Sequence, residues 1–212
     1  MEATFLPSTE CFALQTKYES PQNEITKIRQ IIDKETYYAV LMNDCFNELK
    51  PEKWGSLQAA IEVVVQVNHL LKSLLQVGNT YLIGDELTDI LSNIFLLAHF
   101  EGISFSDIAT YAKTTSSKII DLLFLSSEVL EEIRKNNGYK IQDHEVEDSK
   151  ITIKEKLSEM IIIVFNYAKE FNKDLANEFE TMHKNSTKFL YNKMILKSGE
   201  QDGNIRYFWW KL

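Results

Sequence analysis

The stretch "DELTDILSNIFLLAHFEGISFSDIATYAK", residues 85–113, decides the fold that we expect for this chain. It places Glu86 and Asp89 three positions apart, directly before the apolar run 90–98. Apolar residues in a run of this length, interrupted at helical spacing, are typical of a buried helix, and Gly102 is a suitable residue to end it. The stretch therefore predicts a core helix with two carboxylates near its start, then a break and a further helix.

The composition favours the same fold class for the whole chain. Its 212 residues are 44% hydrophobic, enough to bury a core, and only 7 Gly and 3 Pro interrupt it. These numbers favour long helices over a turn-rich β fold. We expect an all-α bundle of about six helices: one from Pro21, one from Ser56 as N-cap, one in the opening stretch, one after Ser104, and two near 151–171 and 174–195.

The charge balance limits the classes of partner. The net charge of -8, from 31 acidic and 23 basic residues, argues against a nucleic-acid-binding protein, because phosphate binding needs concentrated positive charge. Residues 1–20 contain neither a basic n-region nor an apolar run that could be a signal or a membrane span. Cys11 and Cys45 form no metal-binding or redox motif. We therefore expect a soluble intracellular protein, in the cytoplasm or nucleus, with no membrane partner.

Changes in composition suggest the boundaries within the chain. We expect an N-terminal arm (1–20), a first helical half (21–138), a polar linker (139–150), a second helical half (151–196) and an aromatic tail (197–212).

The tail suggests a protein partner. Four adjacent aromatic residues, Tyr207 to Trp210, are costly to leave in water, so they should pack on this domain or on another chain. We expect a protein partner or a homodimer, formed through helical faces and the 205–212 segment.

The two halves resemble each other. A shift of 70 residues superimposes 86–119 on 156–189 without a gap, and it places Gly102 over Asn172 and Asp89 over Glu159. The coincidence of the helix break in both copies predicts tandem helical hairpins and a pseudo-twofold bundle.

The carboxylate pair admits two interpretations. Residues three apart on a helix project from one side, so Glu86 and Asp89 would repel each other unless a cation lies between them. Mg²⁺ binds one or two protein carboxylates together with substrate phosphates, which would make the pair part of a nucleotide site. Alternatively, the two acids simply complement the dipole at the start of a helix.

The opening stretch resembles the all-α nucleoside triphosphate pyrophosphohydrolases, the MazG-like family. The similarity rests on Glu86-Leu87-Thr88-Asp89, on the apolar run 90–98, on the restart "GISFSDI" at 102–108, and on "MHKNSTKF" at 182–189 in the second copy. The resemblance implies a helical bundle and Mg²⁺-dependent hydrolysis of a nucleotide to its monophosphate and pyrophosphate. It also implies that an ExxE pair on the preceding helix joins the ExxD pair around the metal.

The chain departs from that family on the preceding helix. Val63 and Gln66 occupy the positions of the two expected glutamates, and Glu62 lies one residue out of register. Valine cannot bind a metal, whereas glutamine offers a neutral oxygen. The resemblance then implies Mg²⁺ held by Glu62, Gln66, Glu86 and Asp89, with Glu62, Glu86 and Asp89 as the catalytic carboxylates.

Other residues would contact the substrate in such a site. Lys113 and Lys118 would lie near the phosphates, and Trp54 could stack on the base or pack over the end of the bundle. His69 is expected to be a hydrogen-bonded boundary residue, and His183 to be solvated among polar neighbours.

The second copy has a different defect. Lys156 stands at the first position of its ExxD motif, where an ammonium group would compete with a metal. A composite site, in which Glu86 and Asp89 face Glu128 and Glu131, would restore four carboxylates.

Three functions remain open: nucleotide hydrolysis, nucleotide or metal binding without turnover, and a structural role as an interaction module. Loss of anionic ligands lowers both Mg²⁺ affinity and charge compensation around a triphosphate. The sequence therefore favours a non-catalytic interaction or structural subunit with a decayed site, with the pyrophosphohydrolase as the alternative.

Overall fold

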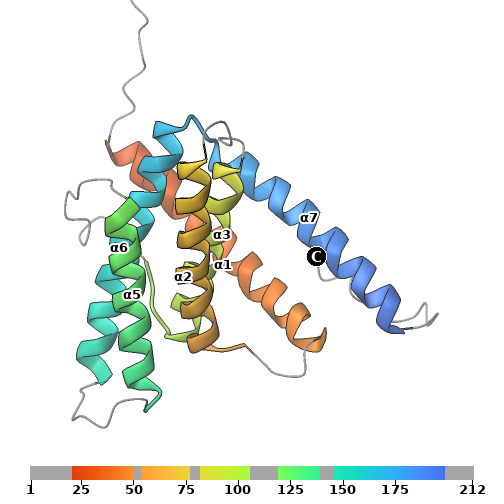
Figure 1. Cartoon of the computed structure of the whole chain (residues 1–212), viewed down its shortest axis with the longest axis horizontal. Helices are drawn as coiled ribbons and strands as arrows, with labels where there is room; N and C mark the ends of the chain where they lie inside the picture. The colour runs from red at the N-terminus through yellow and green to blue at the C-terminus, as the bar shows by residue number, and fades with distance from the viewer. Residues whose placement is uncertain (1–20, 50–53, 77–81, 106–118, 139–145, 199–212) are drawn as a thin grey trace, which may run out of the picture.

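The computed structural model describes residues 21–49, 54–76, 82–105, 119–138 and 146–198, and all regular structure in these ranges is α-helical. The helices are α1 (Pro21–Leu49), α2 (Ser56–Leu75), α3 (Ile83–Phe100), α5 (Ile119–Asn136), α6 (Val146–Glu170) and α7 (Leu175–Ser198) (Figure 1). The expected all-α fold is confirmed for this part of the chain.

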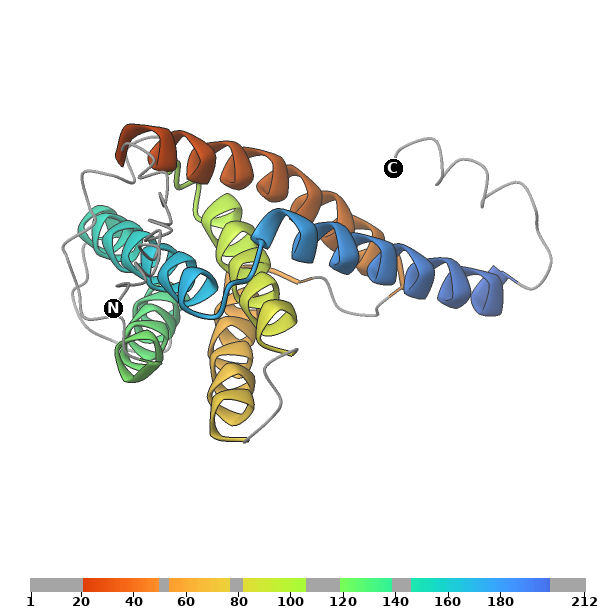
Figure 2. The same ribbon diagram turned by 90° about the horizontal axis from the view of Figure 1, so that it is seen from above.

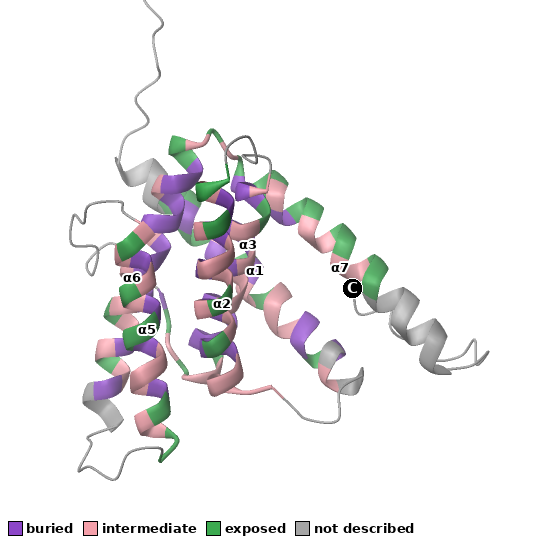
Figure 3. Ribbon diagram, viewed as in Figure 1, coloured by how far each residue is buried: buried purple, intermediate pink, exposed green. Residues whose placement is uncertain are grey.

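Helix α3 is the central element of the bundle. It packs against α1, α2, α6 and α7, and its apolar residues are buried in every direction around the helix axis. The consecutive residues Ile94 to Ala98 are all buried, which covers more than one full turn (Figure 3). Each large side chain buried in this way contributes about 1.5–3 kcal/mol. The opening stretch therefore does form the core helix that its sequence predicts.

All the other described helices share one core with α3. Helix α2 packs against α3 and also against α5, while α6 contacts both α5 and α3. One continuous apolar cluster includes residues from all six described helices. The expected halves 21–138 and 151–196 are consequently not separate in space, because α6 and α7 pack on helices of the first half.

Two of the expected boundaries can be compared with the structure. Helix α6 begins at Val146, so the last five residues of the expected 139–150 linker are helical, and that prediction is wrong there. The expected N-terminal arm 1–20 and all but the first two residues of the expected tail 197–212 lie outside the described residues. Residues 197 and 198 are the last two of α7.

Helices α3 and α6 end in the same way. Gly102 and Asn172, the two residues that the 70-residue shift aligns, both adopt positive φ, 61° and 52°. In each copy the next N–H donates to the carbonyl five residues back, from Ile103 to Ala98 at 2.8 Å and from Lys173 to Ala168 at 2.7 Å. This is the Schellman ending of a helix. The predicted equivalence of the two breaks is confirmed, while the tandem arrangement of whole hairpins stays a prediction.

Helix α7 and the second half of α1 leave the bundle side by side, as Figures 1 and 2 show. From here on, 'the arm' means this pair of helical segments, the second half of α1 together with α7, and not the expected N-terminal segment 1–20. A buried contact joins its two helices at the base: Glu35 Oε2 lies 2.6 Å from His183 Nε2, and the two side chains are only 4% and 15% exposed. The Tyr38 ring stacks on His183, and its hydroxyl donates to the His183 carbonyl at 3.3 Å. The expectation that His183 is solvated is therefore wrong.

We expect His183→Ala to destabilise the protein by about 3 kcal/mol, because it leaves the buried Glu35 carboxylate without its main partner. Lys184→Ala is the control, since Lys184 is exposed and its pair with Glu180 is exposed as well. Replacing Glu35 and His183 together by leucine should cost less than His183→Leu alone. Urea denaturation measures all four variants, and a single-variant loss no larger than that of the control would contradict the assigned role.

Candidate functional site

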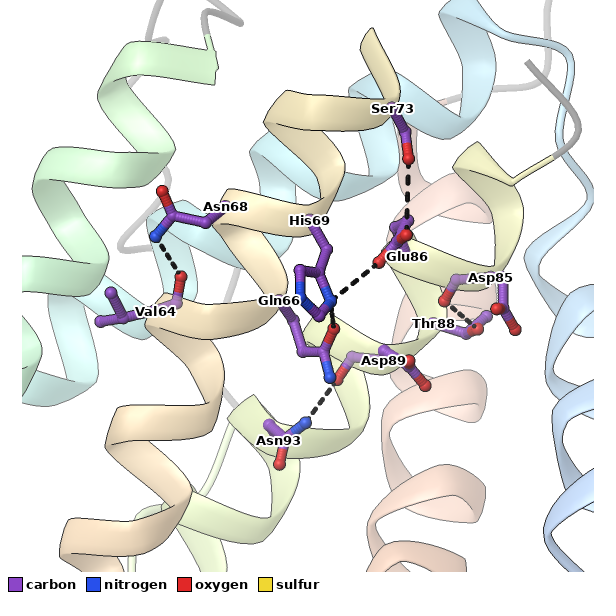
Figure 4. Close-up of polar contacts among 10 residues, drawn as sticks. All are labelled: Val64, Gln66, Asn68, His69, Ser73, Asp85, Glu86, Thr88, Asp89 and Asn93. Carbon is purple, nitrogen blue, oxygen red and sulfur yellow. Dashed lines mark hydrogen bonds and ion pairs between the residues drawn. The ribbon is translucent and has the colours of Figure 1, made fainter. Parts of the chain in front are cut away.

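The first of the two predicted carboxylates, Glu86, is held by side chains of α2. Ser73 donates to Glu86 Oε1 at 3.4 Å, and His69 Nδ1 lies 3.8 Å from Glu86 Oε2 (Figure 4). The Glu86 side chain is 16% exposed. Burial raises the pKa of Glu86, while His69 and the Ser73 hydroxyl oppose that shift. Glu86 thus has two protein partners on the helix that faces it.

The two α2 positions that the family resemblance assigns to glutamates serve structural purposes. Val63 is completely buried and belongs to the core. Gln66 Oε1 lies 3.0 Å from His69 Nδ1, so Gln66 orients the ring that contacts Glu86. Gln66 and His69 of α2 therefore form a small polar network with Glu86 of α3, beside an aliphatic core.

The second predicted carboxylate, Asp89, points in a different direction. In Figure 4 its side chain extends away from Gln66 and His69. It reaches a cavity between α3 and the arm instead. Among the residues that the structure describes, its carboxylate forms neither a hydrogen bond nor an ion pair. Asp89 is thus a largely buried acid without a partner in the described part of the chain.

The surroundings of Asp89 are strongly acidic. Burial, together with the negative charges of Asp85, Glu86 and Glu62, raises the pKa of Asp89 to about 7. The charge of Glu62 acts on Asp89 despite its position out of register. The fold therefore does bring Glu62, Glu86 and Asp89 into one electrostatic neighbourhood.

The cavity beside Asp89 has a volume of about 240 Å³. Its walls come from α1, α3, α7 and the short segment before α2, and its lining includes Tyr38, Met42, Trp54, Asn93 and Met182. Asp89 is the only charged residue among the described residues that line it. The cavity therefore combines one acid with aromatic rings, thioethers and amides.

The predicted ligands differ in how far the structure brings them together. Trp54 and Asp89 line the same cavity, as a shared site requires, whereas Lys113 and Lys118 lie outside the described residues. Within the described ranges, no three His, Cys, Asp or Glu side chains are grouped so that they could hold a metal ion. The set Glu62, Gln66, Glu86 and Asp89 stays a prediction.

The alternative composite site is not formed. Glu128 binds Lys156 of α6, and Glu131 lies 3.7 Å from Arg134 of its own helix. Helix α2 packs against both α3 and α5 and so separates these glutamates from Glu86 and Asp89. The prediction of four facing carboxylates is wrong because Lys156, on α6, provides the partner that Glu128 needs.

Comparison with protein-family models, with curated proteins and with solved structures gives no match to this chain. The MazG-like resemblance therefore stays a prediction, which depends on the motif residues alone. In the described part of the chain, no helix is long and apolar enough to cross a membrane.

Sequence reasoning missed most of the cavity. On α3, the other lining residues follow Asp89 at helical spacing and share its face; they are Ser92, Asn93 and Leu96. This mostly polar face on an otherwise apolar helix could have indicated a site there. On α1, Tyr38 and Met42 stand out only as members of an apolar series. Nothing in their spacing shows that they face a cavity rather than a packed helix.

We expect Asp89→Asn to stabilise the protein at alkaline pH. Because the folded-state pKa of about 7 exceeds the ordinary value of 3.8, folding favours the protonated form. Stability is therefore lost as the pH rises from about 4 to about 7. The asparagine variant avoids this loss, so it should exceed the parent by roughly 2–4 kcal/mol at about pH 8 and by little at about pH 4.

Urea denaturation at both pH values measures the difference. Asp44→Asn on α1 is the matched control, because Asp44 is exposed and does not line the cavity. A gain for Asp89→Asn that is the same at both pH values would show that the carboxylate keeps its ordinary pKa.

Proposed function

We propose that this chain is a non-catalytic helical subunit that acts by binding a protein partner. The observation that carries the claim of a non-catalytic subunit is the separation of the two carboxylates. Glu86 is bound by side chains of α2, whereas Asp89 points away from them into a cavity. A Mg²⁺ ion needs oxygen ligands that converge in near-octahedral geometry. The two acids do not supply such convergence in this arrangement.

The cavity supports the same conclusion. A triphosphate is recognised by cationic side chains or by bound metal ions. Among the described residues, the cavity lining has no Lys, Arg or His, and the acids around Asp89 would repel phosphate oxygens. Binding of a free nucleotide there would be electrostatically unfavourable.

One observation favours the alternative, a Mg²⁺-dependent nucleoside triphosphate pyrophosphohydrolase. The charges of Glu62, Asp85 and Glu86 all act on Asp89 and raise its pKa. A divalent cation would relieve that repulsion, and rotation of the Asp89 side chain toward α2 would bring it closer to Glu86. Trp54, in the same cavity, would then be available to stack on a base.

Pyrophosphate release separates the two functions. We expect no Mg²⁺-dependent release from any of the common ribo- and deoxyribonucleoside triphosphates above that of Glu86→Gln, because the metal ligands do not converge. The measurement is a coupled pyrophosphate assay with and without Mg²⁺. If Glu86→Gln and Asp89→Asn abolish a release that Asp44→Asn retains, the alternative function is correct.

The arm is the surface that we assign to the partner. Tyr37 of α1 is 70% exposed and Phe189 of α7 is 48% exposed, although both belong to helices with buried apolar faces. Exposed aromatic side chains of this kind are enriched in protein interfaces. Because identical chains most often associate through the same surface about a twofold axis, we take the partner to be a second copy of the chain.

We expect the wild-type chain to form a dimer and the double variant Tyr37→Ser/Phe189→Ser to be a monomer, because the substitutions remove apolar area from the arm. Light scattering after size-exclusion chromatography measures the mass. Leu75→Ser is the control, since Leu75 is equally exposed but lies at the end of α2, outside the arm. A wild-type monomer, or a dimer that persists in the double variant, would exclude this interface.

A further inference from the structure

The cavity between α3 and the arm has an unusual distribution of charge. Asp89 lies on its wall without a protein partner among the described residues, and no described lining residue is basic. A largely buried carboxylate without a counter-charge is costly. A ligand that supplies the missing positive charge would remove that cost.

We propose that this cavity binds a small organic cation, namely a primary ammonium compound with a flat apolar body. The ammonium group would lie against the Asp89 carboxylate and donate hydrogen bonds to it. This site lies between α3 and the arm, not on the exposed surface that we assign to the partner, and it needs neither a metal ion nor a nucleotide.

The charges around the cavity select a cation over an anion. Glu62, Asp85 and Glu86 all act on Asp89 from α2 and α3, so the potential at its carboxylate is negative. The His69 ring of α2 lies against Glu86 and does not line the cavity. An anionic ligand would meet repulsion from Asp89 and no positively charged side chain in the described lining, whereas a cation would be attracted.

The cavity walls select an organic cation over a hydrated metal ion. Trp54 and Tyr38 contribute aromatic rings, which attract ammonium groups through their π faces. Met42 and Met182 contribute polarizable apolar surface, and Asn93 adds an amide that can accept a hydrogen bond. A Mg²⁺ ion would find only one carboxylate here, with mostly apolar surface opposite.

The size of the cavity limits the ligand. An apolar protein cavity of about 150 Å³ holds a benzene molecule, so a volume of about 240 Å³ suits a compound with on the order of ten non-hydrogen atoms. A phenyl ring joined to an ammonium group by a short alkyl chain meets this limit. A nucleoside triphosphate would extend well outside the cavity.

The test is a titration of the full chain with phenethylammonium at about pH 8. Calorimetry measures the binding, and amide chemical shifts locate it. Phenylethanol and phenylacetate are the neutral and anionic controls of the same shape. We expect saturable binding of phenethylammonium, at least tenfold weaker binding of phenylethanol, and no binding of phenylacetate. The amide shifts should be largest on α3 around Asp89 and on the facing parts of α1 and α7.

Two variants separate the site from general effects. Asp89→Asn keeps the shape of the side chain and should weaken phenethylammonium binding at least tenfold, whereas Asp44→Asn, on the exposed side of α1, should change it less than twofold. Retention of binding by Asp89→Asn, or equal binding of the ammonium and carboxylate probes, would overturn the proposal. So would a cavity that binds a Mg²⁺-nucleotide complex and not phenethylammonium.

Discussion

Helix α3 is enclosed by α1, α2, α6 and α7, and the rest of the structure depends on that enclosure. A helix surrounded on all sides can be apolar all round, as the residues from Ile94 to Ala98 are. Its few polar side chains must then find partners on the neighbouring helices or border a cavity. Thr88, although fully buried, meets this requirement locally by donating to the carbonyl of Asp85 at 2.9 Å.

The two carboxylates of α3 meet the same requirement in opposite ways. Glu86 lies where α2 offers a hydroxyl and an imidazole, so its carboxylate has partners within the bundle. Asp89, nearly one turn later, lies opposite α1 and α7, which present aromatic and thioether groups to the cavity. The same helix therefore has one carboxylate in a structural network and one beside open space. Burial raises the pKa of both, and it raises that of Asp89 to about 7. A raised pKa of this kind is more frequent at binding sites than in packed cores.

How much of this could be predicted from the sequence depends on the range of the interaction concerned. The core helix and the shared break at Gly102 and Asn172 follow from local periodicity and turn chemistry. Both depend on residues that are close together in the sequence, so both could be predicted from it. The Glu35–His183 pair joins residues that are far apart along the chain, and its two members give no local signal. The direction of the Asp89 side chain likewise depends on which helices pack on each side of α3, which spacing along a single helix cannot show.

The position of the cavity connects the two proposed activities of the chain. One wall belongs to α3, whereas Tyr38 and Met182 on the opposite side belong to the helices of the arm. A ligand that contacts both walls stabilises the docked position of the arm by its own binding free energy. By thermodynamic linkage, a partner that binds the arm in that position must raise the affinity of the cavity for its ligand by the same factor. The contact of Glu35 with His183 joins α1 to α7 within the arm, so it holds the two arm helices together, whereas the ligand would connect both of them to α3.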